Sequence, residues 1–246
     1  MSGHSKWATI KRAKAKTDAA RGKVFTKFIR EITTASKIGG PDPSANPRLR
    51  LALDKAKAAN MPNDNIKRAI DRASGSDAAV MEEVMYEGYG PGGVAIMVSA
   101  ITDNKNRTTG EVRNIFTKGG GNLGSAGSVS YIFHRLGTLT YDKTKVDAET
   151  LEMDAIDAGA EDIKTDENEV EIVTKPEDFE KVSAALKKYE PLNAEITMVP
   201  ATSVKLTGDD ARKTLKLVAS LEELDDVQSV YANFDIPDEI INEASS

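Results

Sequence analysis

A short stretch at the start of the chain has the residue types that bind phosphate groups. The segment GHSKWATIKRAKAKTDAARGK, residues 3–23, holds one acidic residue, Asp18, among the seven cations Lys6, Lys11, Arg12, Lys14, Lys16, Arg21 and Lys23. Lys and Arg at this density neutralise phosphates without reading base sequence. Two roles stay open for Trp7: stacking on an unpaired base, or packing against the helices that follow. A solvated tail that only aids solubility explains this basic arm, residues 3–23, equally well on composition.

A second motif, GGGNLG at residues 119–124, formally matches the dinucleotide fingerprint G-x-G-x-x-G. That fingerprint needs a strand before it and a helix after it, so that pyrophosphate lies on a helix N-terminus. Here a helical pattern precedes the glycines and a strand pattern follows them. We therefore expect an exposed, flexible glycine loop, with Gly119 or Gly120 ending the helix, and a contact surface for RNA or protein as the alternative.

The remaining polar residues offer no constellation for catalysis. His4 and His134 have no partner at metal-ligand or triad spacing, and the chain has no cysteine. Pairs of acids fall at helix starts or in loops, where the helix dipole and solvation account for them. We expect no enzyme activity, no metal and no cofactor. A polar cluster before a predicted helix is interpreted as turn-forming rather than anion-binding; it consists of Asp103, Asn104, Asn106 and Arg107.

Charge is distributed very unevenly along the chain. Residues 1–75 hold 17 Lys or Arg and 6 Asp or Glu, whereas the rest of the chain holds 16 and 33, so a net charge of −6 conceals a basic first part. Such asymmetry indicates nucleic-acid or membrane contact by the basic part. The longest apolar runs, such as VAIMV at residues 94–98, are far shorter than the ~20 residues of a membrane helix, which favours nucleic acid and argues against a membrane partner.

The elements that must position the basic arm are helical. Apolar residues recur at three- and four-residue steps between Val24 and Ile38, and Gly39 and Gly40 end that segment. Asn46 followed by Pro47 predicts the cap and first residue of a second helix, and a third is predicted from Asn63 to Ala73. The sequence therefore predicts a three-helix domain with a basic arm over residues 1–75.

The chain after Gly75 changes to strand patterns. We predict an α+β protein in which a discontinuous α/β domain, residues 76–135 plus 201–246, carries an inserted domain. The insert, residues 136–200, has the β-α-β-β-α-β order of ferredoxin-like modules and is acidic, with 7 Lys or Arg and 17 Asp or Glu. The detailed expectations are strands at 84–89, 94–103, 129–133, 138–141, 170–173, 195–199, 204–206 and 227–234, and helices from Thr108 or Thr109 and over 148–158, 176–189 and 209–221.

Five stretches of the sequence together resemble the YebC/PmpR family: GHSKWATIK at 3–11, MPNDNIKRAI at 61–70, YEGYGPGGVAIMV at 86–98, TDNKNRT at 102–108 and GGNLGSAGSVSYIF at 120–133. The resemblance runs from residue 2 to about Pro237. It implies three domains, with the last inserted into the middle one. A secretory signal is not expected, because the start of the chain lacks an apolar region, and the resemblance argues against a mitochondrial transit peptide, so we expect a bacterial cytoplasmic protein.

The resemblance also implies a regulator of gene expression. The first candidate function is a DNA-binding transcriptional regulator whose basic arm contacts phosphates, with Lys27 and Arg30 continuing the basic stripe along the first helix. The alternative is a ribosome-associated translation factor that binds RNA and relieves stalling at proline-rich stretches; an adaptor without nucleic acid is the third. We expect a monomer whose acidic domains face away from the nucleic acid or toward a basic protein partner or the ribosome.

Overall fold

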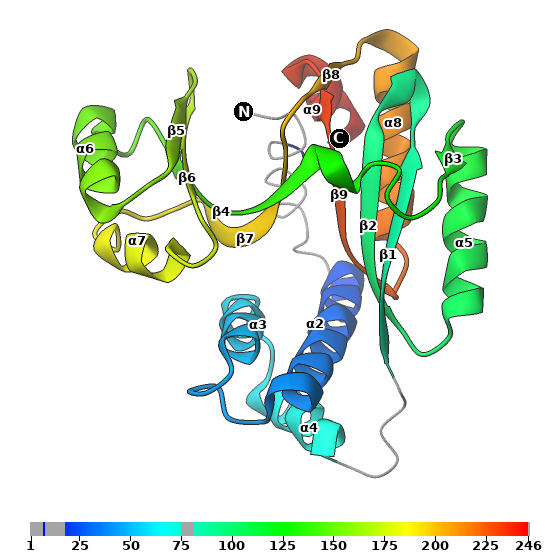
Figure 1. The fold of residues 1–246 in the computed structure, drawn as a ribbon, viewed down its shortest axis with the longest axis horizontal. Coiled ribbons are helices and arrows are strands. Elements are labelled where there is room, and N and C mark those ends of the chain that lie inside the picture. The colour runs from blue at the N-terminus through cyan, green and yellow to red at the C-terminus, as the bar shows by residue number, and fades with distance from the viewer. Residues whose placement is uncertain (1–6, 8–17, 75–80, 246) are drawn as a thin grey trace.

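The structure is a computed structural model that describes Trp7, residues 18–74 and residues 81–245. Within these ranges a group of helices lies beneath two separate four-stranded sheets (Figure 1). Strands β4 and β7 belong to one of these sheets and extend toward the other (Figure 1). The mixed helix and sheet architecture predicted from the sequence is confirmed.

Three helices form the first group: α2 (Asp18–Gly39), α3 (Pro47–Ala58) and α4 (Asn63–Ser74). The predicted cap of α3 is confirmed, because the side chain of Asn46 accepts a hydrogen bond from the Leu49 N–H at 3.1 Å. Its amide also donates to the Ala35 carbonyl at 2.8 Å, which ties the start of α3 to α2. Buried side chains such as Ile32, Leu49 and Ile66 fill the space between the helices.

The middle domain is a four-stranded sheet of order β3-β1-β2-β9, covered on one face by α5 and α8 (Figure 1). The antiparallel pairing of β2 with β9 brings the chain after residue 200 back to this sheet, as the sequence predicts. Its elements are β1 (Glu82–Tyr89), a 3-10 turn (Pro91–Gly93), β2 (Ala95–Thr102), α5 (Lys105–Lys118), β3 (Asn122–Leu123), α8 (Gly208–Glu222) and β9 (Val227–Ala232). A helix α9 (Asp238–Ser245), which the sequence pattern does not predict, follows.

The inserted sheet has the order β5-β6-β4-β7, and every neighbouring pair in it is antiparallel. Numbered within the insert, this is the order 2-3-1-4 of a split β-α-β arrangement, so the ferredoxin-like topology predicted from the sequence is confirmed. Its elements are β4 (Phe133–Asp142), α6 (Ala148–Ala158), β5 (Asp162–Thr165), β6 (Glu169–Thr174), α7 (Phe179–Ala185) and β7 (Asn193–Pro200). We infer residues 136–200 as the insert because this sheet and its core are separate from those of the middle domain.

Several local predictions are wrong, and two of them fail where a buried carboxylate takes the expected local donors. The cap of α5 is Asn104, whose side chain accepts from the Arg107 N–H at 3.1 Å, since the hydroxyl of Thr108 is bonded to Asp226 instead. Residues 130–132 form a 3-10 turn and not a strand. Helix α7 is shorter than expected, and β8 (Val204–Lys205) pairs with β10 (Phe234–Asp235) in a separate parallel pair.

Candidate nucleic-acid interface

Most of the basic arm lies outside the described residues. Lys6, Lys11, Arg12, Lys14 and Lys16 belong to that part, and Arg21 lies in the first turns of α2. Their proposed contacts with phosphates therefore stay predictions.

Trp7 lies in the hydrophobic core of the middle domain. Its side chain is 4% exposed and belongs to a buried cluster that includes Val98 of β2 and Leu215 of α8. Packing against the three helices was one of the two roles open for Trp7, and the structure places the ring against the sheet domain instead. A base can stack on this indole only if Trp7 leaves the core. The burial of Trp7 is not what a wholly solvated tail would show.

The basic stripe along α2 faces the middle domain. Lys23 forms an ion pair with Glu223, and Lys27 donates to the Glu222 carbonyl at 2.7 Å. Arg30 forms an ion pair with Asp226 and donates to the Ile101 carbonyl at 2.8 Å. Acidic residues of the turn after α8 thus pair with this stripe, while the orientation of the acidic domains toward a nucleic acid or a basic protein partner stays a prediction. Phosphate contacts by these three cations remain predictions, and each has a partner within the chain.

Asp226 is the centre of that interface. Its carboxylate, 6% exposed, accepts hydrogen bonds from Arg30 of α2, from Thr102 at 3.0 Å, and from Arg107 and Thr108 of α5 at 2.9 and 2.6 Å. Burial raises the pKa of this carboxyl, but the hydroxyl of Thr108 and the two guanidinium groups outweigh burial and hold the pKa below its usual range. One buried charge thus joins three elements from two domains.

The glycine loop of residues 119–124 continues to residue 131, and a second buried carboxylate, Glu87 of β1, holds this longer loop. It accepts the N–H groups of Gly127, Val129 and Ser130, each at 2.8 Å. These bonds take backbone donors that a strand over 129–133 would need, which explains the missing strand. Burial raises the pKa of Glu87, yet the three N–H bonds prevail and lower it.

Residues 119–124 are also not the loosely held segment predicted from their composition, because the Gly124 N–H donates to the Glu87 carbonyl at 2.8 Å. A Cβ on Gly121 would lie 2.4 Å from the Tyr89 carbonyl oxygen, so the backbone approaches β1 too closely for another residue. The hydroxyl of Tyr89 donates to the Ser128 carbonyl at 2.7 Å. Gly119 does end α5, as predicted, and the loop still exposes Tyr131, at 71%.

We expect the substitution Glu87→Gln to loosen this loop and to destabilise the protein by about 1–3 kcal/mol, because an amide nitrogen cannot accept a backbone N–H. Urea unfolding measures the loss of stability, and amide hydrogen exchange at Gly127, Val129 and Ser130 locates it. The exposed Glu82 of the same strand provides the matched control, Glu82→Gln, with an effect within about 0.5 kcal/mol. Unchanged exchange at all three amides in the Glu87 variant would contradict this role.

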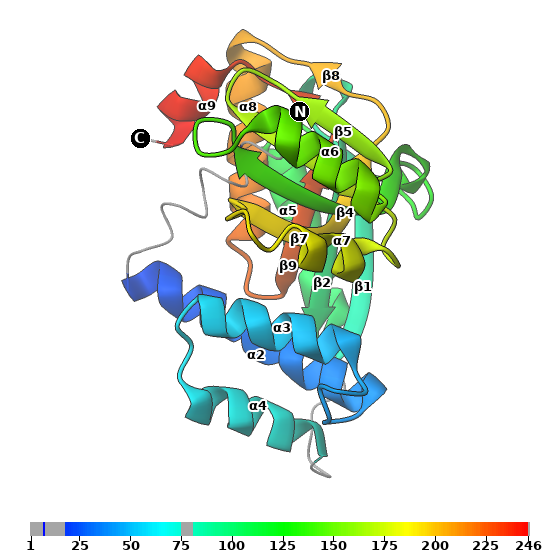
Figure 2. The same cartoon turned by 90° about the vertical axis from the view of Figure 1, so that its left-hand side faces the viewer.

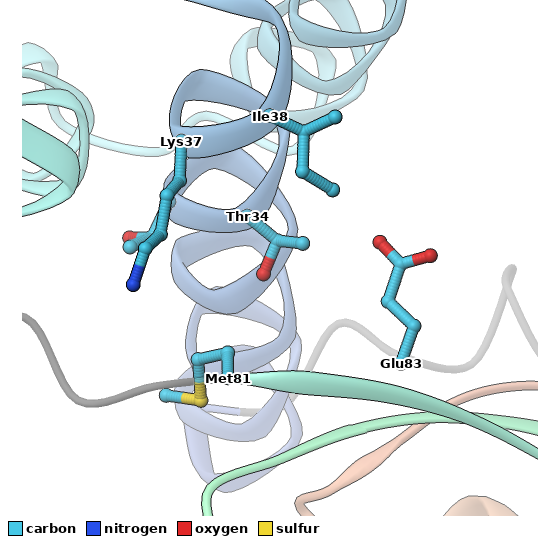
Figure 3. A pocket seen from close by; sticks show the side chains of 6 residues that line it. Thr34, Lys37, Ile38, Met81 and Glu83 are labelled. Atoms are coloured by element: carbon cyan, nitrogen blue, oxygen red, sulfur yellow. The ribbon is translucent and has the colours of Figure 1, made fainter.

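Other features of the described residues do not support a catalytic centre. A hollow of about 270 Å³ lies where the end of α2 meets the start of β1; in Figure 3, Thr34, Lys37 and Ile38 of α2 face Met81 and Glu83. No group of His, Cys, Asp and Glu suited to a metal ion occurs in the part of the chain that the structure describes. None of the described helices is long and apolar enough to cross a bilayer.

Three cations of α3, Arg48, Arg50 and Lys55, are not predicted as interface residues, because nothing in the local sequence distinguishes them from other solvated side chains. Arg48 contacts Glu31 at 2.7 Å and also pairs with Glu83 at 2.5 Å. Arg50 and Lys55 reach the inserted domain. Lys67, Arg68 and Arg72 of α4 are exposed. The helical domain thus carries further basic residues beyond the predicted arm.

The chain is similar to known proteins along almost its whole length. A family model described as the TACO1/YebC protein N-terminal domain matches residues 5–76, and one described as the TACO1/YebC second and third domain matches residues 81–234.

Two curated relatives, each named "Probable transcriptional regulatory protein", span nearly the same length. The relative from Treponema denticola is 56% identical over 97% of this chain and 98% of its own. The relative from Dictyoglomus turgidum is 53% identical over 100% of both chains. A crystallised conserved hypothetical protein from Aquifex aeolicus matches with a TM-score of 0.82 and 51% identity, over 92% of this chain and 95% of its own.

Proposed function

Because the chain belongs to the TACO1/YebC family, we propose that it is a non-enzymatic, DNA-binding regulator of transcription whose basic arm contacts phosphates. The observation that carries this proposal is the density of seven cations against one acid in residues 3–23. The name of the relatives from Treponema denticola and Dictyoglomus turgidum supports the regulatory role.

The alternative is a ribosome-associated factor that binds RNA. The observation that favours it concerns α2, whose cations Lys23, Lys27 and Arg30 are directed at the middle domain. A protein that reads base sequence in the major groove presents a helix whose side chains reach base edges. A mode of binding that relies on backbone phosphates serves structured RNA as well as duplex DNA.

Sedimentation of a cell lysate through a sucrose gradient separates the two functions. A transcriptional regulator is expected to remain apart from ribosomal particles, and a translation factor to comigrate with them until the particles are dissociated. Purified protein is titrated in parallel with a labelled 20-base-pair DNA duplex and a 20-nucleotide RNA at several salt concentrations. If neither nucleic acid binds in a salt-dependent way, both functions are excluded.

A further inference from the structure

The helical domain also touches the acidic inserted domain, although the two are far apart in the sequence. Figure 2 shows α3 lying beneath α7 and β7 of the insert. Arg50 pairs with Glu180 at 2.8 Å, and Lys55 pairs with Glu195 at 3.4 Å. The partners are 130 and 140 residues apart. The contact therefore joins two domains that are connected only through the middle one.

We propose that Arg50 and Lys55 form a second phosphate-binding site, which Glu180 and Glu195 of the inserted domain cover until nucleic acid displaces them. This inference rests on the proposed function and assigns a role to the acidic insert. Glutamate carboxylates present anionic oxygens to Arg and Lys through the same donors that phosphate uses. The carboxylates of the insert thus bind the α3 cations Arg50 and Lys55 through the same groups that the phosphates of a nucleic acid would contact.

Displacement is feasible because three of the four side chains are well exposed. The side chains of Arg50 and Glu180 are 38% and 59% exposed; that of Lys55 is 49% exposed and its partner Glu195 is 16% exposed. Exposed pairs contribute little to stability and are screened by salt, whereas a nucleic acid presents many phosphates at once and gains from releasing counterions.

The buried ion pair at Asp226 gives the opening motion a fixed point. Arg30 and Asp226 are 17% and 6% exposed, so phosphates in solution have little access to this contact. When the Arg50 and Lys55 pairs open, the helical domain stays docked on the middle domain through Arg30 of α2, and α3 separates from the insert.

The first test compares variants of the covering carboxylates. The double substitution Glu180→Gln and Glu195→Gln is expected to tighten binding of a 20-base-pair DNA duplex at low salt by about 2- to 30-fold, which corresponds to two ion pairs that no longer have to be broken. Glu177→Gln with Glu190→Gln is the matched control, since it removes two exposed acids of the same domain without touching α3. Equal tightening in both variants would mean general charge repulsion and would overturn the proposal.

The second test removes the cations. Arg50→Gln with Lys55→Gln is expected to weaken duplex binding and to flatten the dependence of log affinity on log salt by about 1.8, because about 0.9 counterions are released per phosphate neutralised. If the wild type binds duplex but this variant shows the same slope and affinity, the proposed site at Arg50 and Lys55 is wrong, while the proposed function is not affected. If the wild type itself binds no duplex, the proposed function and this site both fail.

A distance measurement checks the opening directly. The chain has no cysteine, so Ala58→Cys on α3 and Ala185→Cys on α7, both exposed, accept a donor and an acceptor dye. Energy transfer is expected to fall when saturating duplex is added to this protein, and to be low without duplex when Glu180→Gln and Glu195→Gln are also present. Transfer that stays constant on saturation with duplex would show that the domains do not separate, and the proposal would be wrong.

Discussion

Replacing Lys11, Arg12, Lys14 and Lys16 together by glutamine is expected to flatten the salt dependence of binding by about 3.6 for duplex DNA and about 2.8 for single strands. If about five of the seven arm cations neutralise phosphates, the slope of log affinity against log salt in the wild type is about −4.5 for duplex and −3.5 for single strands. The fourfold variant is expected to retain only a small part of this slope. Because phosphates carry no base identity, different sequences are expected to be weakened almost equally.

The measurement is a salt titration of wild type and variant on DNA, structured RNA and ribosomes, with circular dichroism to show that the variant is folded. A fourfold variant of exposed lysines in the acidic part of the chain, Lys175, Lys181, Lys187 and Lys205, removes the same total charge and is expected to leave the slope unchanged. Equal flattening in both variants points to net charge rather than to the arm. Weakening of one sequence only would mean that the arm reads bases.

The second large effect is expected at Asp226. The substitution Asp226→Asn leaves Arg30 and Arg107 beside an amide that offers one acceptor in place of two. Breaking a buried pair by removing one partner costs about 3–5 kcal/mol, which lowers the unfolding temperature of a chain of this size by roughly 6–20 °C. The adjacent Asp225 is exposed, and Asp225→Asn is expected to change stability by less than about 0.5 kcal/mol.

Thermal unfolding followed by circular dichroism measures both variants, and the pH dependence gives an independent check. The folded-state pKa of Asp226 is lowered, so its contribution is present above the pKa of the unfolded carboxyl and is lost as the pH falls through the folded value. The difference in stability between wild type and Asp226→Asn is therefore expected to be largest near neutral pH and to shrink in acid. A difference that stays constant with pH would assign the effect to packing and not to the charge.

The topology of this molecule follows from local patterns in the sequence, and its domain interfaces do not. Apolar spacing between Val24 and Ile38, the Asn46-Pro47 cap and the strand-helix order of the insert each depend on neighbours within a few residues. The helices and strands that such local patterns predict are present in the folded protein, because these elements also bury their apolar faces against one another.

The ion pairs at the interfaces connect residues that no local pattern relates. Lys23 and Glu223 are 200 residues apart, and either residue alone has the sequence environment of an ordinary exposed charge. The prediction of a flexible glycine loop is wrong for a similar reason. The composition of the loop favours flexibility, but the buried carboxylate that organises it belongs to Glu87 of β1, 40 or more residues earlier in the chain. Of the candidate interface, the sequence predicts the cations of the arm and of α2 but not those of α3, and the partners of the cations emerge only from the fold.

The insertion of one domain into another also affects the order in which the chain folds. Strand β2 obtains its outer neighbour only when β9 has been made, after the whole insert, and pairing over such a separation slows folding. The insert is complete in the chain earlier and domains fold as units during synthesis. Once β4 and β7 pair, Phe133 lies opposite Pro200, and the loop that β2 and β9 must close is effectively shorter. The ferredoxin-like insert thus reduces the entropy cost of completing the sheet that carries it.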